Sequence, residues 1–106
     1  MRDAYIVTSV RTPGCKMGKG AFRDTRPEDL LSFIIDAAVD RTPSLEKKDI
    51  DDIMAGCCFP EAEQGLNIGR IAGQLAGLPA EVSGATVNRF CASGLEAICQ
   101  ACLRVM

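Results

Sequence analysis

The chain has 106 residues, which is enough for one compact domain and too few for two. Hydrophobic residues make up 47% and charged residues 25% of the sequence, and the formal net charge is −2, which are ordinary values for a globular protein. Because the basic residues are scattered among acidic ones, no nucleic-acid-binding surface is expected. No apolar run is long enough to predict a membrane span.

The first predicted element is a buried strand over residues 4–10, a stretch rich in β-branched and aromatic side chains. The residues before it form neither the apolar core and cleavage site of a signal peptide nor the Arg-rich start of a transit peptide. A cytoplasmic location is therefore expected. Arg11-Thr12-Pro13-Gly14 ends the strand, and a loop rich in glycine and lysine follows to about Ala21.

A helix is predicted over residues 27–41. Thr25 and Glu28 have the spacing of a capping box, and Pro27 between them suits a first helical turn. The apolar side chains that follow form a wide stripe, which indicates heavy burial. Thr42-Pro43-Ser44 ends the helix.

A second buried strand is predicted over residues 52–58, after a charged stretch. Beyond the next loop, Asn67 is expected to cap a short helix with one apolar face. Gly77 and Pro79 are the signals that end this helix.

A third strand is predicted over residues 84–90, and a third helix from about Ala92 to the end of the chain. The apolar stripe of that helix comprises Leu95, Ile98, Cys99, Cys102, Val105 and Met106. Strands and helices thus alternate as βαβαβα, which favours an α/β fold with a parallel sheet and right-handed crossovers. Three strands make a small sheet, and no glycine or proline ends the last helix, so we expect a longer parent protein.

The six cysteines are predicted to be free thiols. They are Cys15, Cys57, Cys58, Cys91, Cys99 and Cys102. Their spacing is not that of a disulfide framework, and no secretory signal accompanies them. Cys99-x-x-Cys102 has the spacing of zinc ligands, but a second pair and any histidine are missing, so no metal site is expected. Core packing is predicted for Cys57, Cys58, Cys99 and Cys102, and an exposed loop for Cys15.

Cys91 stands where the predicted third strand meets the predicted third helix. The unpaired N–H groups and the dipole of a helix start favour the thiolate, which is the reactive form of cysteine. Ligands of open parallel sheets bind beyond the carboxyl ends of the strands, and Cys91 lies at such an end. The alternative is a small buried residue at a junction. Because the chain has no histidine, a catalytic Cys91 needs a base from elsewhere.

Several separate segments together resemble the start of a thiolase. They are Arg11-Thr12-Pro13, Gly56 and above all residues 87–98, with the sequence VNRFCASGLEAI. Residues 23–27 and 60–67 resemble the degradative branch, the 3-ketoacyl-CoA thiolases of fatty-acid oxidation. The resemblance runs through essentially all 106 residues. Pro13-Gly14-Cys15-Lys16 departs from the usual pattern of this family and affects a local turn.

The resemblance implies a three-layer thiolase-like fold, with residues 1–106 as a partial N-terminal domain from the first of two similar halves. It implies that Cys91 is the nucleophile that takes the acyl group as a thioester, and that its backbone N–H contributes to an oxyanion hole. The catalytic His, Asn and second Cys of the family, and its CoA-binding loop domain, lie downstream of these residues. We therefore expect residues 1–106 alone to be inactive and to expose large apolar patches.

The implied reaction cleaves a 3-ketoacyl-CoA with CoA to give acetyl-CoA and a shortened acyl-CoA, or runs in reverse. Coenzyme A is then a substrate, and no cofactor is implied. The resemblance also implies a homodimer or homotetramer that forms through the strand carrying Val87, Asn88 and Arg89. Two other functions stay open at this point: a non-catalytic thiolase-like interaction module, and a redox-sensitive thiol protein.

Overall fold

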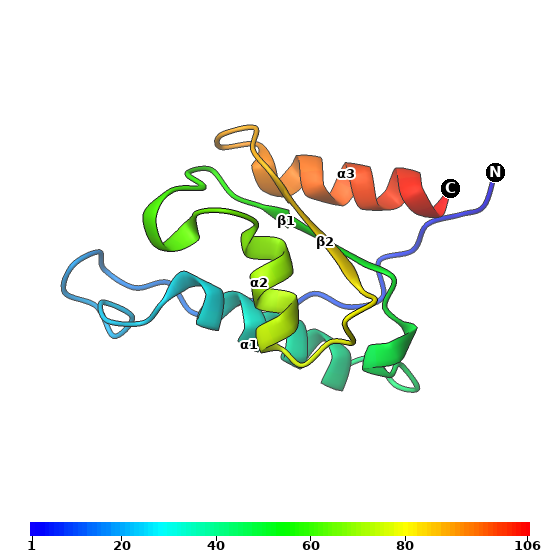
Figure 1. The fold of residues 1–106 in the computed structure, drawn as a ribbon, viewed down its shortest axis with the longest axis horizontal. Helices are drawn as coiled ribbons and strands as arrows, with labels where there is room; N and C mark the ends of the chain where they lie inside the picture. Colours follow the sequence, from blue (N-terminus) through cyan, green and yellow to red (C-terminus); the bar gives the residue numbers. More distant parts are fainter.

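The structure, a computed structural model, describes residues 1–106 and is built around two parallel strands (Figure 1). β1, Asp52–Gly56, pairs with β2, Ser83–Val87, so that Gly56 lies opposite Val87. The predicted α/β class and the parallel pairing are confirmed. Because the two strands run in the same direction, their carboxyl ends meet at one edge of the sheet.

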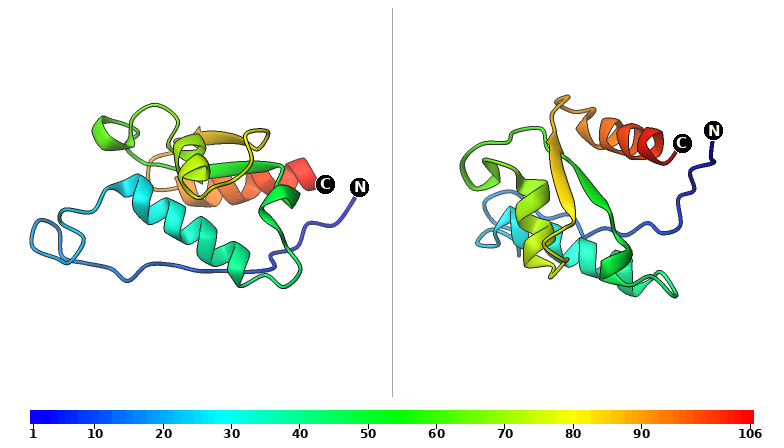
Figure 2. Two further views of the ribbon diagram at one scale, coloured as in Figure 1. Left: turned by 60° about the horizontal axis from the view of Figure 1, so that its bottom comes forward. Right: turned by 45° about the vertical axis from the view of Figure 1, so that its right-hand side comes forward.

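Helices cover both faces of the sheet and give the molecule three layers. α3, Ser93–Val105, lies on one face, while α1, Pro27–Asp40, and α2, Ile68–Leu75, lie on the other (Figure 2). Two short 3₁₀ turns, η1 at Lys47–Asp49 and η2 at Ala62–Gln64, lie in the connections before and after β1. None of the three α-helices has the length and apolarity needed to cross a bilayer.

α1 begins and ends within one residue of its predicted bounds, but the predicted capping box is wrong. Pro27 is the first helical residue, so the N-cap is Arg26 and not Thr25, and no side chain caps the helix. Glu28 therefore comes one position too early in the helix to complete a box. Its buried carboxylate instead forms an ion pair with the Arg26 guanidinium.

Asn67 caps α2 as predicted and also ties this helix to the sheet. Its Oδ1 accepts hydrogen bonds from the backbone N–H of Arg70 at 3.3 Å and from the Thr86 hydroxyl at 2.8 Å. Its Nδ2 donates to the carbonyl oxygen of Gly84 at 2.7 Å. Gly77, in the left-handed region at φ +70°, follows the end of the helix and confirms the predicted stop signal.

Both strands end earlier than predicted. β1 ends at Gly56 and not at residue 58, although Cys57 N–H still donates to the carbonyl oxygen of Val87 at 2.9 Å. β2 spans 83–87 in place of the predicted 84–90. It ends because Asn88 begins a tight turn in which Phe90 takes a left-handed φ of +48°, which is incompatible with a strand.

The strand predicted over residues 4–10 is not formed. The segment has no regular secondary structure, and the side chains of Tyr5, Ile6 and Val7 are exposed. Near it, Arg2 N–H donates to the carbonyl oxygen of Met106 at 3.2 Å, which brings the two ends of the chain together. The composition of this segment predicts burial on two faces, but no second layer of these 106 residues covers it. Without that cover, the composition alone does not produce a strand.

The core is small, because only 13 of the 106 residues are buried. α2, which contacts both the sheet and α1, provides much of it, and its Ala72 is fully buried. Sixteen large apolar side chains are exposed, which confirms the expected apolar patches. Those of α3 and the C-terminus are Leu95, Ile98, Leu103, Val105 and Met106.

The core packing predicted for Cys99 is wrong, and the reason is the orientation of α3. The helix presents its small residues Ser93 and Ala97, both buried, to β1. The larger apolar stripe that the periodicity identified points away from the sheet, and with it Cys99 is exposed. Cys102, on the flank of the stripe, is half-buried.

Candidate functional site

The carboxyl ends of the two strands converge on the start of α3. Gly56, the last residue of β1, packs against the backbone of Ser93, the first residue of this helix. A Cβ placed on Gly56 would lie 2.5 Å from the carbonyl carbon and oxygen of Ser93 and 2.7 Å from the nitrogen of Gly94. Glycine is thus the residue that lets α3 begin this close to the sheet.

A tight turn over residues 88–92 links β2 to α3. The Asn88 Oδ1 accepts a hydrogen bond from the backbone N–H of Phe90 at 2.8 Å, which is an Asx turn. The Ala92 N–H donates to the carbonyl oxygen of Arg89 at 3.0 Å and closes the turn on its other side. Phe90 has a φ of +48°, which costs free energy for a bulky L-residue.

Ser93 joins both sides of this turn. Its hydroxyl accepts from the Arg89 N–H at 2.9 Å and donates to the carbonyl oxygen of Phe90 at 2.6 Å. The Ser93 N–H donates to the same Phe90 oxygen at 3.0 Å. Ser93 is 3% exposed, so these bonds are shielded from competing water.

Cys91 lies at the tip of this turn, one residue before Ala92, the N-cap of α3. The predicted place of Cys91 between the strand and the helix is confirmed, but a turn separates it from β2, which ends at Val87. The residue is exposed, so the alternative of a small buried residue does not hold. Cys91 thus lies directly before the N-cap of a 13-residue helix. The arrangement presents an accessible sulfur nucleophile at the carboxyl end of a parallel sheet.

Cys58 is the nearest thiol neighbour of Cys91. It follows the end of β1 and is half-buried. Burial first, and then the adjacent Cys91 thiol, raise the pKa of Cys58 above the ordinary thiol value. Cys58 therefore stays protonated near neutral pH. Cys57, beside it in sequence, is buried as predicted and lies 3.6 Å from the Gln64 Oε1, to which its thiol donates.

Arg89 is directed along α3 by an ion pair with Glu96. The Gln100 amide, which donates to the Glu96 Oε1 at 2.9 Å, lowers the pKa of Glu96, and the Arg89 guanidinium lowers it further. The charges of Arg89 and Glu96 therefore compensate each other on the helix surface beside the turn.

The remaining candidate cysteines lie away from this site. Cys15 is exposed in the N-terminal loop as predicted, and Cys99 and Cys102 lie further along α3. All six cysteines are free. No group of three or more His, Cys, Asp or Glu side chains has an arrangement that could hold a metal ion.

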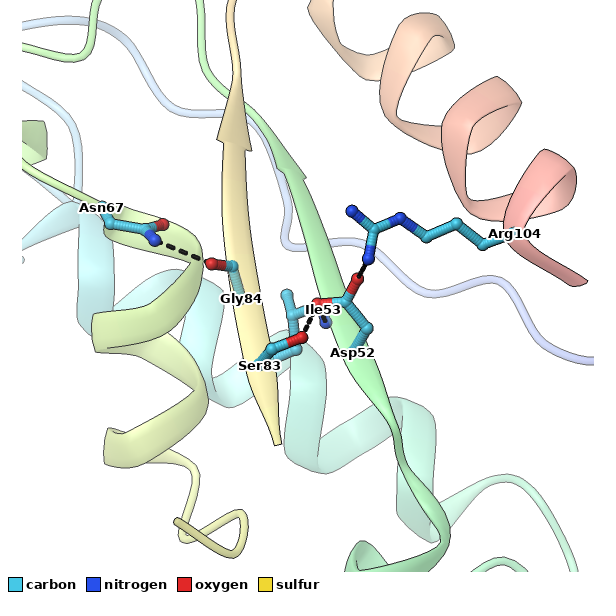
Figure 3. A network of polar contacts seen from close by, with 6 residues as sticks. All are labelled: Asp52, Ile53, Asn67, Ser83, Gly84 and Arg104. Atoms are coloured by element: carbon cyan, nitrogen blue, oxygen red, sulfur yellow. Dashed lines mark hydrogen bonds and ion pairs between the residues drawn. The ribbon is translucent and has the colours of Figure 1, made fainter. Parts of the chain in front are cut away.

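The largest cavity, about 600 Å³, lies at the opposite end of the strands, next to Asp52, Ser83 and Arg104 (Figure 3). The Asp52 carboxylate accepts from the Ser83 hydroxyl at 2.6 Å and from the Ile53 N–H at 2.9 Å, and it pairs with Arg104. These polar groups are already engaged with one another in linking α3 to both strands. The Ser83 hydroxyl and the Asp52 carboxylate are committed to these contacts, so Cys91 remains the candidate site.

Three features of the site were missed by reasoning from the sequence: the hydroxyl of Ser93, the Asx turn of Asn88 and the nearness of Cys58. Asn88 did carry a recognisable signal, because Asn before a turn commonly bonds to the backbone two residues on. The left-handed φ of Phe90 has no such signal, because a bulky aromatic residue rarely adopts it.

Comparison with known proteins agrees with this geometry. Residues 4–106 match the family described as thiolase, N-terminal domain. The chain is 45% identical over 106 residues to a 3-ketoacyl-CoA thiolase of Bacillus subtilis (strain 168), and the match covers all of this chain and 27% of that protein. It is 42% identical over 106 residues to a 3-ketoacyl-CoA thiolase of Colwellia psychrerythraea, covering all of this chain and 28% of that protein.

The crystal structure of the Bacillus anthracis acetyl-CoA acetyltransferase has the same fold over these residues. The TM-score is 0.88 at 32% sequence identity, and the match covers 96% of this chain and 25% of that chain. The chain thus spans about a quarter of the length of the proteins to which it is similar. The chain belongs to the thiolase family and comprises residues of its N-terminal domain.

Proposed function

We propose that Cys91 is the nucleophile of a thiolase, of which these 106 residues provide the opening part of the first half. The single observation that carries this proposal is the exposed Cys91 thiol, held at the carboxyl end of a parallel strand and directly before α3. Family membership and relatives that are named 3-ketoacyl-CoA thiolase support it. Cys99, although exposed, lies in the middle of the helix and lacks this setting.

In the proposed reaction, the Cys91 sulfur attacks the 3-keto carbon of a 3-ketoacyl-CoA. The bond between C2 and C3 breaks, its electron pair goes to C2, and C2 takes a proton and leaves as acetyl-CoA. The acyl group stays on sulfur as a thioester. The thiol of CoA, having lost its proton to a base, attacks that thioester, releases the shortened acyl-CoA and restores the Cys91 thiolate. The reverse sequence of steps gives condensation.

The backbone around Cys91 is suited to this chemistry. Negative charge develops on the substrate oxygen as sulfur attacks, and the Cys91 N–H near the start of α3 is a donor that would stabilise it. These 106 residues contain no histidine, so the base must come from the rest of the protein. By family resemblance, a His and a second Cys supply that function. Coenzyme A enters as a substrate, and no separate cofactor takes part.

Two finer aspects follow from the same proposal. The names of the relatives favour the degradative direction, in which fatty acyl chains are shortened in β-oxidation.

A homodimer or homotetramer would form through the part of β2 and the turn that carries Val87, Asn88 and Arg89. The free edge of β2 supports this assembly, because β1 pairs with one edge of β2 and no strand pairs with the other. A strict monomer in sedimentation of the full chain at micromolar concentration would contradict the assembly.

A thiolysis assay on the full chain tests the proposed function. The substrates are acetoacetyl-CoA and a longer 3-ketoacyl-CoA, each with CoA. The Cys91→Ser variant should lose at least about a thousandfold in kcat, because catalytic groups that act as a unit lose most of their effect together. Cys99→Ser is the matched control, because it alters another exposed cysteine that lies away from the turn. Cys91→Ser activity within tenfold of wild type would contradict the proposal.

A further inference from the structure

The turn that carries Cys91 is held in an unfavourable backbone conformation. Phe90, the residue before Cys91, has a φ of +48°, a region that bulky L-residues avoid. Such a conformation persists only where the surrounding contacts enforce it. The contacts that enforce it here therefore also determine where the Cys91 thiol points.

Ser93 makes the contacts on both sides of the strained residue. Its hydroxyl accepts from the N–H of Arg89, which precedes Phe90, at 2.9 Å. The same hydroxyl donates to the carbonyl oxygen of Phe90 at 2.6 Å, and the Ser93 N–H donates to that oxygen at 3.0 Å. The carbonyl is thus bound at both of its lone pairs by one residue.

The Phe90 carbonyl belongs to the same planar peptide group as the N–H of Cys91. In a trans peptide the C=O and the N–H point in opposite directions, and every peptide bond of the chain is trans. Fixing the carbonyl towards Ser93 therefore fixes the Cys91 N–H in the opposite direction. This is the N–H that the proposed reaction uses to stabilise the substrate oxygen.

Ser93 is itself held firmly. It is 3% exposed and packs against Gly56, where even a Cβ would come within 2.5 Å of its carbonyl group. If its hydroxyl is removed, the Arg89 N–H loses its partner in a place that water does not readily reach. The one side-chain contact that α3 then keeps with the turn is the ion pair of Glu96 with the Arg89 guanidinium, which does not hold the backbone at Phe90.

We propose that Ser93 is a positioning residue for Cys91. Its hydroxyl fixes the backbone of the turn over residues 88–92, so that the thiol and the N–H of Cys91 face the same substrate carbonyl group. This inference rests on the proposed function for its effect on turnover. Its effect on the accessibility of the thiol is independent of that function. Ser93 does not touch the substrate.

The test compares Ser93→Ala with Ser83→Ala in the full chain. Ser83 is a matched control, because its hydroxyl donates to Asp52 at the other end of β2, away from Cys91. Ser93→Ala should lower kcat by about tenfold to a hundredfold with KM within about twofold, because small misplacement of a reacting group has effects of this size. The control should keep kcat within about twofold.

A second measurement separates this inference from the proposed function. The rate of Cys91 labelling by iodoacetamide, followed by peptide mapping, requires no turnover. It should fall at least about threefold in Ser93→Ala and stay unchanged in Ser83→Ala, since the thiol loses its fixed place beside the helix start. A wild type without thiolysis activity but with this labelling difference would refute the proposed function and keep the role of Ser93.

Two further variants distinguish the hydroxyl from the size of the side chain. Ser93→Thr keeps the hydroxyl, and Ser93→Cys keeps the size but donates only weakly. The inference predicts that kcat of Ser93→Thr exceeds that of Ser93→Cys, even if Ser93→Ala does not fold. A folded Ser93→Ala with wild-type kcat, or a Ser93→Cys as active as Ser93→Thr, would overturn it.

Discussion

Gly56 at the end of β1 and Ser93 at the start of α3 are in direct backbone contact. The contact is so close that a Cβ on Gly56 would lie 2.5 Å from the carbonyl carbon and oxygen of Ser93. It sets the distance between the sheet and the helix at the end where Cys91 lies. The position of the candidate nucleophile thus depends on the absence of a side chain at residue 56.

Gly56→Ala should therefore disturb both stability and the site. The added methyl group meets backbone, which cannot move aside as a flexible side chain can, so we expect the free energy of unfolding to fall by about 1–3 kcal/mol. Thiolysis by the full chain should fall with it. Gly14→Ala is the control, because nothing lies within 4 Å of a Cβ there. Equal unfolding midpoints in urea for Gly56→Ala and wild type would contradict this prediction.

Asn67 should prove important for the attachment of α2 to the sheet. Asn67→Ala removes the helix cap and the bonds to Thr86 and Gly84, so we expect a loss of about 2 kcal/mol in the free energy of unfolding. Asn67→Asp keeps an oxygen for the cap but loses the donor to Gly84, and should show roughly half that loss. If the two variants were equally destabilised, the cap would not contribute as described.

The raised pKa of Cys58 predicts a decline in stability at alkaline pH. The folded protein holds this proton more tightly than the unfolded chain does. The contribution of the protonated Cys58 thiol to the free energy of unfolding is therefore complete below the ordinary thiol pKa of about 8.5. It is lost as the pH rises through the raised pKa. In urea unfolding between neutral and alkaline pH, Cys58→Ser should show a shallower decline than wild type. Cys15→Ser, at an exposed position, should follow wild type, and a Cys58→Ser slope equal to theirs would count against the assignment.

The lowered pKa of Glu96 predicts the opposite behaviour in acid. Because the Gln100 amide and the Arg89 guanidinium favour the charged carboxylate, its contribution is present above the ordinary Glu pKa of about 4.3. It is lost as the pH falls through the lowered value. Glu96→Gln should flatten the acid side of the stability profile, with Glu81→Gln at an exposed position as the control. Identical acid profiles for the two variants would contradict the role of Glu96.

The elements that were predicted correctly from the sequence are those whose signals are local. Asn67 and Gly77 mark the ends of α2 through side-chain capping and a left-handed φ, and both act within a few residues. Pro27 marked the start of α1 in the same way. The position of Cys91 followed from the order of strand and helix, which needs no knowledge of packing.

The predictions that failed depended on what lies beside an element. Residues 4–10 have the composition of a strand, but they find no neighbouring strand and no covering layer here. The periodicity of α3 identified an apolar stripe but not which face meets β1, and Ser93 and Ala97 proved to be on that face. The role of Ser93 likewise depends on the φ of Phe90, which the sequence does not reveal.

Peptide mapping of the acylated protein tests most directly whether Cys91 forms a covalent acyl intermediate. The full chain is mixed with acetyl-CoA in the absence of a second thiol substrate, quenched in acid and digested. We predict an acetyl group on the peptide that contains Cys91, its release by added CoA, and its absence in Cys91→Ser. Acetylation that persists in Cys91→Ser, or that maps to Cys58 or Cys99 in the wild type, would show that Cys91 is not the nucleophile.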